Sequence, residues 1–315
     1  MKKFPAIFAL LLLWTAGAHA QEEVSLDVGD GVVIRGTLLM PEGVPNPPVV
    51  LIIAGSGPTD RNGNNPQMQN NSLRYLAEGL QKEGVASLRY DKRMIAGSAY
   101  KGMREEDMTF ESLADDARRL ASMLYNDGRF SEIVLAGHSE GAAIAAIAAA
   151  GNPEISKVVS IAGAGRPWDK ILTEQLERNP ANPLPLIAEA KAIMENLRKG
   201  EPVKEVNPLL MPLFRPSVQP YVMSRMRHDP ATDFAKLTVP AMIVQGGKDI
   251  QITTADMFGL LLAQPGARHL YIDDMNHVLK KTTATDTKGQ MPTYATPAPN
   301  HEALAPAIAK FIKGE

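Results

Sequence analysis

Gly137-His138-Ser139-Glu140-Gly141 has the spacing G-x-S-x-G, with an apolar run before it and an alanine-rich run after it. The run Ile133 to Ala136 is typical of a buried strand, and the run Ala142 to Ala150 is typical of a helix. A serine at this junction sits on a tight turn, where the flanking glycines let strand and helix approach closely. We therefore expect Ser139 to be a nucleophile; a plain Gly-Ser turn is the alternative.

A serine hydroxyl needs a base, and the chain contains six histidines. His277 follows the strand-like run Leu270 to Ile272, so it lies on a loop beyond the carboxyl end of a predicted strand. His269 lies at the amino end of that strand, whereas the site is expected at the carboxyl ends of the strands. His301 opens the last predicted helix. We therefore predict that His277 is the general base.

Asp249 is the predicted orienting acid. It follows the apolar run Ala241 to Val244 through a short glycine-containing loop, which again places it beyond the carboxyl end of a strand. The order along the chain is then nucleophile, acid and base. Asp273 and Asp274 are the competing acids, but they are too close to His277 to form an independent orienting loop.

Strand-like runs alternate with helical patterns over most of the chain. Strands are expected at residues 24–28, 32–40, 49–53, 85–90, 133–136, 158–162, 241–244 and 269–272. Helices are expected at residues 73–83, 110–125, 141–150 and 186–198, and a last helix is expected after His301. Gly29-Asp30-Gly31 favours a hairpin between the first two strands. The alternation predicts βαβ units, a mostly parallel sheet and the α/β fold class.

Residues 166–235 interrupt this alternation, because they are rich in proline and contain one amphipathic helix. They are predicted to form a helical cap insertion above the carboxyl edge of the sheet, with residues 21–165 and 236–315 as the core. Met211 and Phe214 would hold an acyl chain if the cap lines the cleft. The alternative is that they only pack the interior of the cap.

The sequence resembles serine hydrolases of the α/β-hydrolase family. The resemblance rests on the serine motif, on Gly246-Gly247-Lys248-Asp249, on Asn276-His277 and on Gly55 to Arg61. The last segment is similar to the loop after the third strand in exported esterase-like and peptidase-like members. The resemblance spans nearly all of residues 24–315 and is weakest across the insertion. It implies an eight-stranded, mostly parallel sheet flanked by helices, and no cofactor.

The resemblance also implies an oxyanion hole made of two backbone N–H groups. The family places one on the residue after the nucleophile, here Glu140, and the other on the loop after the third strand. Many relatives begin that loop with His-Gly, whereas this chain has Ala54-Gly55, which is a departure. Ser56 fits the pattern best as the second donor, and Gly57 is the alternative.

The segment Asp60 to Asn64 begins like a calcium-binding loop, but Asn65 and Asn71 stand where glycine and glutamate belong. We therefore expect no metal. Arg61 in this loop and Arg93, which follows the predicted strand at residues 85–90, are alternative substrate-binding residues.

Composition excludes several classes of function. Lys and Arg total 33 against 35 Asp and Glu, a net charge of −2 with no basic run, which argues against nucleic-acid binding. The absence of Cys excludes disulfides, thiolate metal sites and cysteine nucleophiles.

The N-terminus has the layout of a signal peptide. Met1-Lys2-Lys3 is followed by an apolar stretch to Trp14 and by Ala18-His19-Ala20, which predicts cleavage after Ala20. An uncleaved anchor is the alternative, but the stretch is short for a bilayer. After cleavage no other segment suits a membrane, and we expect a periplasmic or secreted protein.

The leading hypothesis is a carboxylic ester hydrolase that cleaves small or medium acyl esters through an acyl-enzyme, with a small-molecule ester as its partner. A serine peptidase or acylaminoacyl-type amidase is the first alternative, and it would need Glu140, Glu174 or Asp60 to bind a substrate amine. The second alternative is a binding protein that has the hydrolase fold but no catalytic activity. The complete set of Ser, Asp and His argues against it.

Overall fold

The computed structural model of this chain describes residues 21–29, 31–99 and 102–315, so the predicted signal peptide at residues 1–20 lies outside the described residues. Eight strands form one sheet in the order β1-β2-β4-β3-β5-β6-β7-β8. They are β1 (Gln21–Asp27), β2 (Val33–Leu39), β3 (Val49–Ile53), β4 (Ala86–Tyr90), β5 (Ile133–His138), β6 (Lys157–Ile161), β7 (Ala241–Gly246) and β8 (Arg268–Ile272). The pairs β1–β2 and β2–β4 are antiparallel, and all others are parallel. The predicted eight-stranded, mostly parallel sheet is confirmed.

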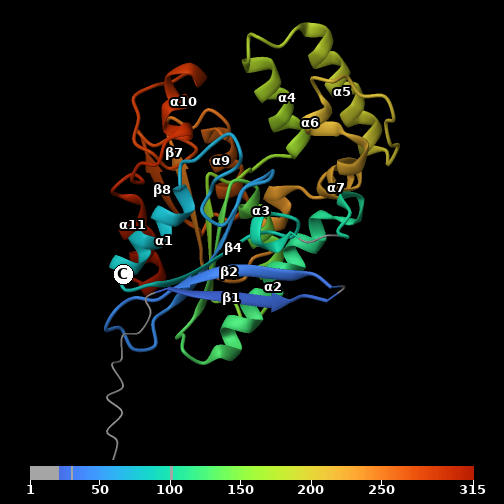
Figure 1. The fold of residues 1–315 in the computed structure, drawn as a ribbon. Coiled ribbons are helices and arrows are strands. Elements are labelled where there is room, and N and C mark those ends of the chain that lie inside the picture. The colour runs from blue at the N-terminus through green and yellow to red at the C-terminus, as the bar shows by residue number, and fades with distance from the viewer. Residues whose placement is uncertain (1–20, 30, 100–101) are drawn as a thin grey trace, which may run out of the picture.

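Helices cover both faces of the sheet (Figure 1). On one face, Val50 and Ile52 of β3 share an apolar cluster with α1 (Ser72–Lys82) and α11 (Leu304–Lys313). On the other face, Val49, Leu51 and Ile53 share a cluster with α2 (Phe110–Asp127), α3 (Glu140–Ala149) and α9 (Thr254–Ala263). Every residue of β3 is therefore buried, at a gain of about 1.5–3 kcal/mol for each Val, Leu or Ile side chain. This explains its continuous apolar run, which is typical of a central parallel strand.

The segment between β6 and β7 is helical. It contains α4 (Trp168–Arg178), α5 (Leu184–Arg198), α6 (Met211–Phe214), the 3₁₀ turn η3 (Pro216–Val218), α7 (Gln219–Arg225) and α8 (Pro230–Ala235). The helices α4 to α7, called the cap helices below, share an apolar core of their own. They stand beyond the carboxyl ends of the parallel strands (Figure 1). The last helix, α8, instead packs against α3 and α9 in the body of the protein.

Several elements were not expected from the sequence, among them two 3₁₀ turns after β4 and one helix after β8. The 3₁₀ turns η1 (Ala96–Ser98) and η2 (Glu105–Asp107) follow β4, and α10 (Thr287–Ala295) lies between β8 and α11. Pro292 lies inside α10, and a proline in a helix interior is a poor predictor of helix. None of the helices in the described residues has the length and apolar character needed to cross a membrane.

Candidate active site

Ser139 lies between the last residue of β5 and the first residue of α3, with backbone angles φ 56° and ψ −120°. Such a conformation costs a non-glycine residue about 1–3 kcal/mol and persists only where the surroundings enforce it. Two hydrogen bonds enforce it here: the Ser139 N–H donates to the Ile161 carbonyl at 2.9 Å, and the Ala142 N–H donates to the Ser139 carbonyl at 3.0 Å. The predicted nucleophile therefore sits on a strained turn at the carboxyl edge of the sheet.

The two glycines of the motif are required by close packing. A Cβ on Gly137 would lie 2.0 Å from the carbonyl oxygen of Gly141, and a Cβ on Gly141 would lie 2.3 Å from that of Ile53. No side chain fits at either position without moving the backbone. The glycines thus allow α3 to start directly against β3 and β5, which creates the sharp turn at the serine.

The structure brings Asp249 and His277 together. His277 Nδ1 lies 2.8 Å from Asp249 Oδ2, and both side chains are almost fully buried. The other carboxylate oxygen, Oδ1, accepts the backbone N–H groups of Gln251 at 2.8 Å and Ile252 at 2.9 Å. Because the carboxylate only accepts, Nδ1 carries the hydrogen and Nε2 is left with a lone pair. Nε2 has no hydrogen-bond partner among residues 21–29, 31–99 and 102–315.

Gly246 and Gly247 explain how the loop after β7, which carries Asp249, meets the loop after β8, which carries His277. A Cβ on Gly246 would lie 2.2 Å from the Met275 carbonyl oxygen, and one on Gly247 would lie 2.5 Å from the Asp273 carbonyl oxygen. The loop after β7 therefore presses against the loop after β8. The Lys248 N–H donates to the Met275 carbonyl at 2.9 Å and locks the contact.

The competing acids are occupied elsewhere. Asp274 pairs with His301 Nε2 at 2.9 Å and with Lys281 at 3.6 Å. Asp273 is exposed on 80% of its side chain and lies 3.9 Å from Lys248. Among the described carboxylates, only that of Asp249 is within hydrogen-bond distance of His277.

The predicted oxyanion donors flank the same turn. A Cβ on Gly55 would lie 3.2 Å from Ser139 Cβ, so the loop after β3 passes directly beside the serine. Ser56 continues that loop, and Glu140 is the first residue of α3, where a helix leaves its N–H groups without internal partners. Neither backbone N–H donates to another group within the described part of the chain.

His138 makes a contact that the sequence did not suggest. Its Nε2 lies 2.8 Å from the backbone carbonyl oxygen of His277, and the two rings are tilted at 48° to each other with their centroids 4.9 Å apart. Burial, helped by the neighbouring His277, lowers the pKa of His138 to about 4. A neutral His138 therefore holds the loop of the predicted base.

Lys280 is a second buried group that the sequence did not single out. Its ammonium group donates to the Ala298 carbonyl and, at 2.8 Å, to Asn300 Oδ1, and it lies 4.7 Å from the ring centroid of Tyr75. Burial lowers its pKa to about 7. These contacts attach the chain just after His277 to the segment that leads into α11.

Three of the predicted substrate-binding residues have side chains that contact other residues of the protein. Phe214 is fully buried in the core of the cap helices, 6.3 Å from the Trp168 ring, which corrects the expectation that it faces the cleft. Arg61 pairs with Asp91 at 2.9 Å and with Glu23 at 2.8 Å. Arg93 makes a two-pronged contact with Asp116 at 2.6 and 2.7 Å. Both guanidinium groups are thus already engaged in ion pairs within the fold.

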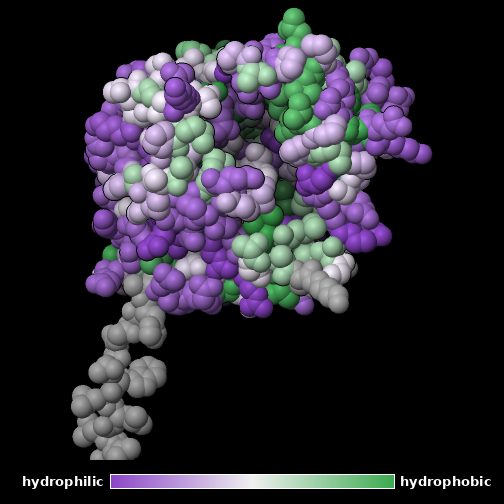
Figure 2. Space-filling view, turned by 45° about the horizontal axis from the view of Figure 1, so that its top comes forward, coloured by the Kyte–Doolittle hydropathy of each residue, from purple (hydrophilic) through white to green (hydrophobic). Residues whose placement is uncertain are grey.

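Met211, the fourth of them, is 39% exposed in α6. Viewed onto the carboxyl edge, the surface is hollowed between the cap helices and the side that carries α10, with hydrophobic residues on the cap side (Figure 2). An exposed apolar residue of the cap is therefore available to a ligand, but no contact ties Met211 to Ser139.

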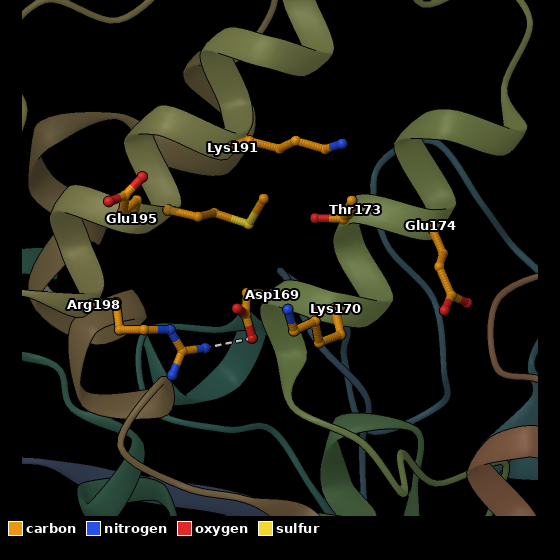
Figure 3. A pocket seen from close by; sticks show the side chains of 8 residues that line it. Asp169, Lys170, Thr173, Glu174, Lys191, Glu195 and Arg198 are labelled. Atoms are coloured by element: carbon orange, nitrogen blue, oxygen red, sulfur yellow. Dashed lines mark ion pairs between the residues drawn. The ribbon is translucent and has the colours of Figure 1, made fainter.

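A cavity of about 510 Å³ lies within the cap, between α4 and α5 (Figure 3). Thr173 and Lys191 point into it from opposite helices, whereas Glu174 points away. Asp169 and Arg198 at its base form an ion pair at 2.5 Å. None of its lining residues belongs to the loops that carry Ser139, Asp249 or His277, so it is separate from the candidate site.

Known proteins resemble this chain in sequence and in fold. The sequence pattern of a family described as serine aminopeptidase, S33 matches residues 68–279. Esterase EstD of Thermotoga maritima is 28% identical over 251 residues, which cover 78% of this chain and 58% of that protein. The chain therefore spans less than two thirds of the length of this relative.

Solved structures show the same fold at low sequence identity. Est1E of Butyrivibrio proteoclasticus, solved with ferulic acid bound, has a TM-score of 0.60 at 20% identity over 92% of this chain and 99% of its own. The Pyrococcus furiosus esterase Pf2001 also reaches 0.60, at 16% identity over 93% of this chain and 91% of its own. Together with the match over residues 68–279, this fold identifies the chain as a member of the serine aminopeptidase S33 family of α/β-hydrolases.

Proposed function

We propose that the protein hydrolyses carboxylic esters of small or medium acyl chains through an acyl-enzyme on Ser139. The observation that carries the proposal is the 2.8 Å hydrogen bond between Asp249 and His277, with the second Asp249 oxygen saturated by two backbone N–H groups. That arrangement leaves one imidazole nitrogen free to accept a proton beside the strained serine turn. Relatives named as esterases support the same chemistry.

In the first half of the reaction, Ser139 Oγ attacks the acyl carbon while His277 Nε2 takes the hydroxyl proton. The carbonyl electrons move onto oxygen, and the backbone N–H groups of Ser56 and Glu140 stabilise the negative charge. When the carbon–oxygen bond to the alcohol breaks, His277 gives its proton to the leaving oxygen. The products are a free alcohol and an acylated serine.

In the second half, water attacks the acyl-enzyme. His277 takes a proton from the water, and the bond between the acyl carbon and Ser139 Oγ breaks. The proton returns to Oγ, which restores the serine and releases the carboxylic acid. Asp249 stays ionised throughout and stabilises the imidazolium that forms in each half.

The peptidase alternative would need Glu140, Glu174 or Asp60 to bind the amine of a substrate, and the contacts of these carboxylates give it little support. Glu140 is buried between Lys92 and Arg225, and Glu174 pairs with Arg166 and Arg178. Asp60 Oδ1 accepts the backbone N–H groups of its own loop. The carboxylates of Glu140 and Glu174 are already paired with cations of the protein, whereas no described residue donates a hydrogen bond to Asp60 Oδ2.

We further propose that the protein is exported and loses residues 1–20. The basic start Met1-Lys2-Lys3, the apolar stretch to Trp14 and the small residues of Ala18-His19-Ala20 support this proposal. The periplasm suits a chain without Cys, which needs no disulfide there.

A substrate panel tests the proposed reaction. We would compare kcat/KM of the purified protein on p-nitrophenyl esters from acetyl to octanoyl with that on aminoacyl and N-acylaminoacyl p-nitroanilides. The proposal predicts turnover of the esters with a preference for the shorter or middle chains. Efficient cleavage of the anilides at the expense of the esters would favour the peptidase, and no turnover of either would favour a binding protein.

A further inference from the structure

Glu140 has a buried carboxylate that the reaction described above does not use. Only 1% of its side chain is exposed, although the residue belongs to the turn that carries Ser139. Lys92 Nζ lies 3.3 Å from its Oε1, and Arg225 Nη1 lies 2.6 Å from its Oε2. Burial raises the pKa of Glu140, but the charges of Arg225 and Lys92 outweigh this effect and keep the pKa below its ordinary value. The carboxylate is therefore ionised and held from two sides.

Lys92 has a second partner, in a different loop. Its Nζ donates to the backbone carbonyl oxygen of Gly55 at 2.5 Å. The side chain is 5% exposed, so both of its contacts are shielded from water. One ammonium group thus links the loop after β3 to the first residue of α3, the two segments expected to supply the oxyanion donors.

The covalent geometry of the peptide gives this contact a direction. The carbonyl of Gly55 and the N–H of Ser56 belong to one planar trans peptide unit, so they point in opposite directions. A cation that fixes the carbonyl on one side therefore fixes the N–H on the other. Donation to the carbonyl also polarises the peptide and strengthens its N–H as a donor.

We propose that Lys92 is a positioning residue of the oxyanion hole: anchored by Glu140, its ammonium group orients the Gly55–Ser56 peptide so that the Ser56 N–H points at the substrate carbonyl oxygen. The inference rests on the proposed ester hydrolysis. It assigns a role to Lys92 in the loop after β4, and it explains why a glutamate directly after the nucleophile is buried.

Arg225 provides a matched control, because it is the other cation on the same carboxylate. Its guanidinium group lies over the rings of Trp168, at 5.1 Å, and Phe110, at 5.9 Å, and so connects Glu140 to the cap helices. It makes no contact with Gly55. Lys92→Met and Arg225→Met each leave Glu140 with one cation, but only the first releases the Gly55–Ser56 peptide.

The test compares an ester with its thionoester, in which sulfur replaces the carbonyl oxygen. Sulfur accepts hydrogen bonds poorly, so an intact oxyanion hole discriminates strongly in favour of the oxygen ester. Removing one oxyanion donor lowers kcat by about 10²–10³, and a misdirected donor should lower it by about 10–100-fold. We expect Lys92→Met to lower kcat on the oxygen ester by that factor, with little change in KM, and to reduce the ratio of oxygen-ester to thionoester kcat/KM. Arg225→Met should lower the melting temperature and keep the ratio.

A ratio that stays at the wild-type value in Lys92→Met would overturn the inference, and so would an equal decrease in Arg225→Met, since either result would make Lys92 only a structural cation. If Lys92→Met does not fold, the double variant Lys92→Met with Glu140→Gln keeps the net charge of the cluster and is expected to show the same reduced ratio. Failure of the wild-type protein to hydrolyse the oxygen ester would instead refute the proposed function.

Discussion

His138 Nε2 donates a hydrogen bond to the backbone carbonyl oxygen of His277 at 2.8 Å, and this bond joins the serine turn to the loop of the predicted base. Because the carbonyl only accepts, Nε2 of His138 must carry the hydrogen. Asp249 orients the ring of His277, whereas His138 holds its backbone. The position of the predicted base is therefore determined from both sides, by residues from β5 and from the loop after β7.

The first prediction concerns acid stability. The pKa of His138 is about 4 in the folded protein and about 6.5 when unfolded. Between these values the unfolded chain binds the proton and the folded chain does not, so the free energy of unfolding falls as the pH drops through this window. The loss from this group should be at most about 3 kcal/mol.

Urea unfolding at about pH 7 and about pH 4.5 measures this effect. His138→Gln should be less stable than wild type near neutrality, because it loses a buried hydrogen bond, but it should lose less stability on acidification. Identical pH dependence in the two proteins would mean that His138 is not buried in its neutral form.

The second prediction separates Asp249 from its neighbours. Asp249→Asn should lower kcat by about 10⁴, as the equivalent change does in serine proteases, because the imidazole adopts the wrong tautomer. The matched control is Asp273→Asn, since Asp273 is exposed and makes no contact with His277. Steady-state kinetics on one p-nitrophenyl ester are sufficient. Near-wild-type turnover in Asp249→Asn would transfer the acid role to another residue.

The third prediction concerns the cap helices. Phe214→Ala removes a fully buried ring from their core and should cost about 3–5 kcal/mol of stability. Because Phe214 does not reach the cleft, the relative kcat/KM values from acetyl to octanoyl esters should stay the same. Met211→Ala, at an exposed position, should change stability by much less. Thermal unfolding and the ester series should be measured on both variants. A Phe214→Ala variant with a changed chain-length preference and no loss of stability would contradict this account.

The fourth prediction concerns processing. Mass measurement on periplasmic material should give a chain that begins at Gln21, because the Ala18-His19-Ala20 segment has small residues where signal peptidase reads them. A protein that retains Met1 and accumulates in the cytoplasm would refute export.

Local patterns in the sequence were sufficient for the sheet and for the catalytic candidates. A strand–serine–helix junction is encoded by neighbouring residues, and Gly137 and Gly141 are required there by contacts of 2.0 and 2.3 Å to a hypothetical Cβ. Asp249 and His277 could be predicted because parallel strands end at one edge, so loops that follow them converge.

Contacts between distant segments could not be read in the same way. The partners of Lys92 are 37 and 48 residues away along the chain, and no local pattern pairs them. Phe214 was ambiguous because an apolar residue in a cap suits a pocket and a core equally well, and only packing against Trp168 decides between them. The helix α10 was missed because Pro292 lowers its helix propensity, whereas Gln290 and Thr293 attach it to neighbouring loops through hydrogen bonds.

Labelling with a fluorophosphonate tests the central claim, that Ser139 is the nucleophile activated by His277. The reagent should add to wild-type protein at a single site, and peptide mass spectrometry should locate the adduct on Ser139. Ser139→Ala should fold, with an unchanged circular dichroism spectrum, and take up no label, while His277→Ala should label far more slowly. An adduct on another residue of the wild-type protein, or undiminished labelling of Ser139→Ala, would contradict the account.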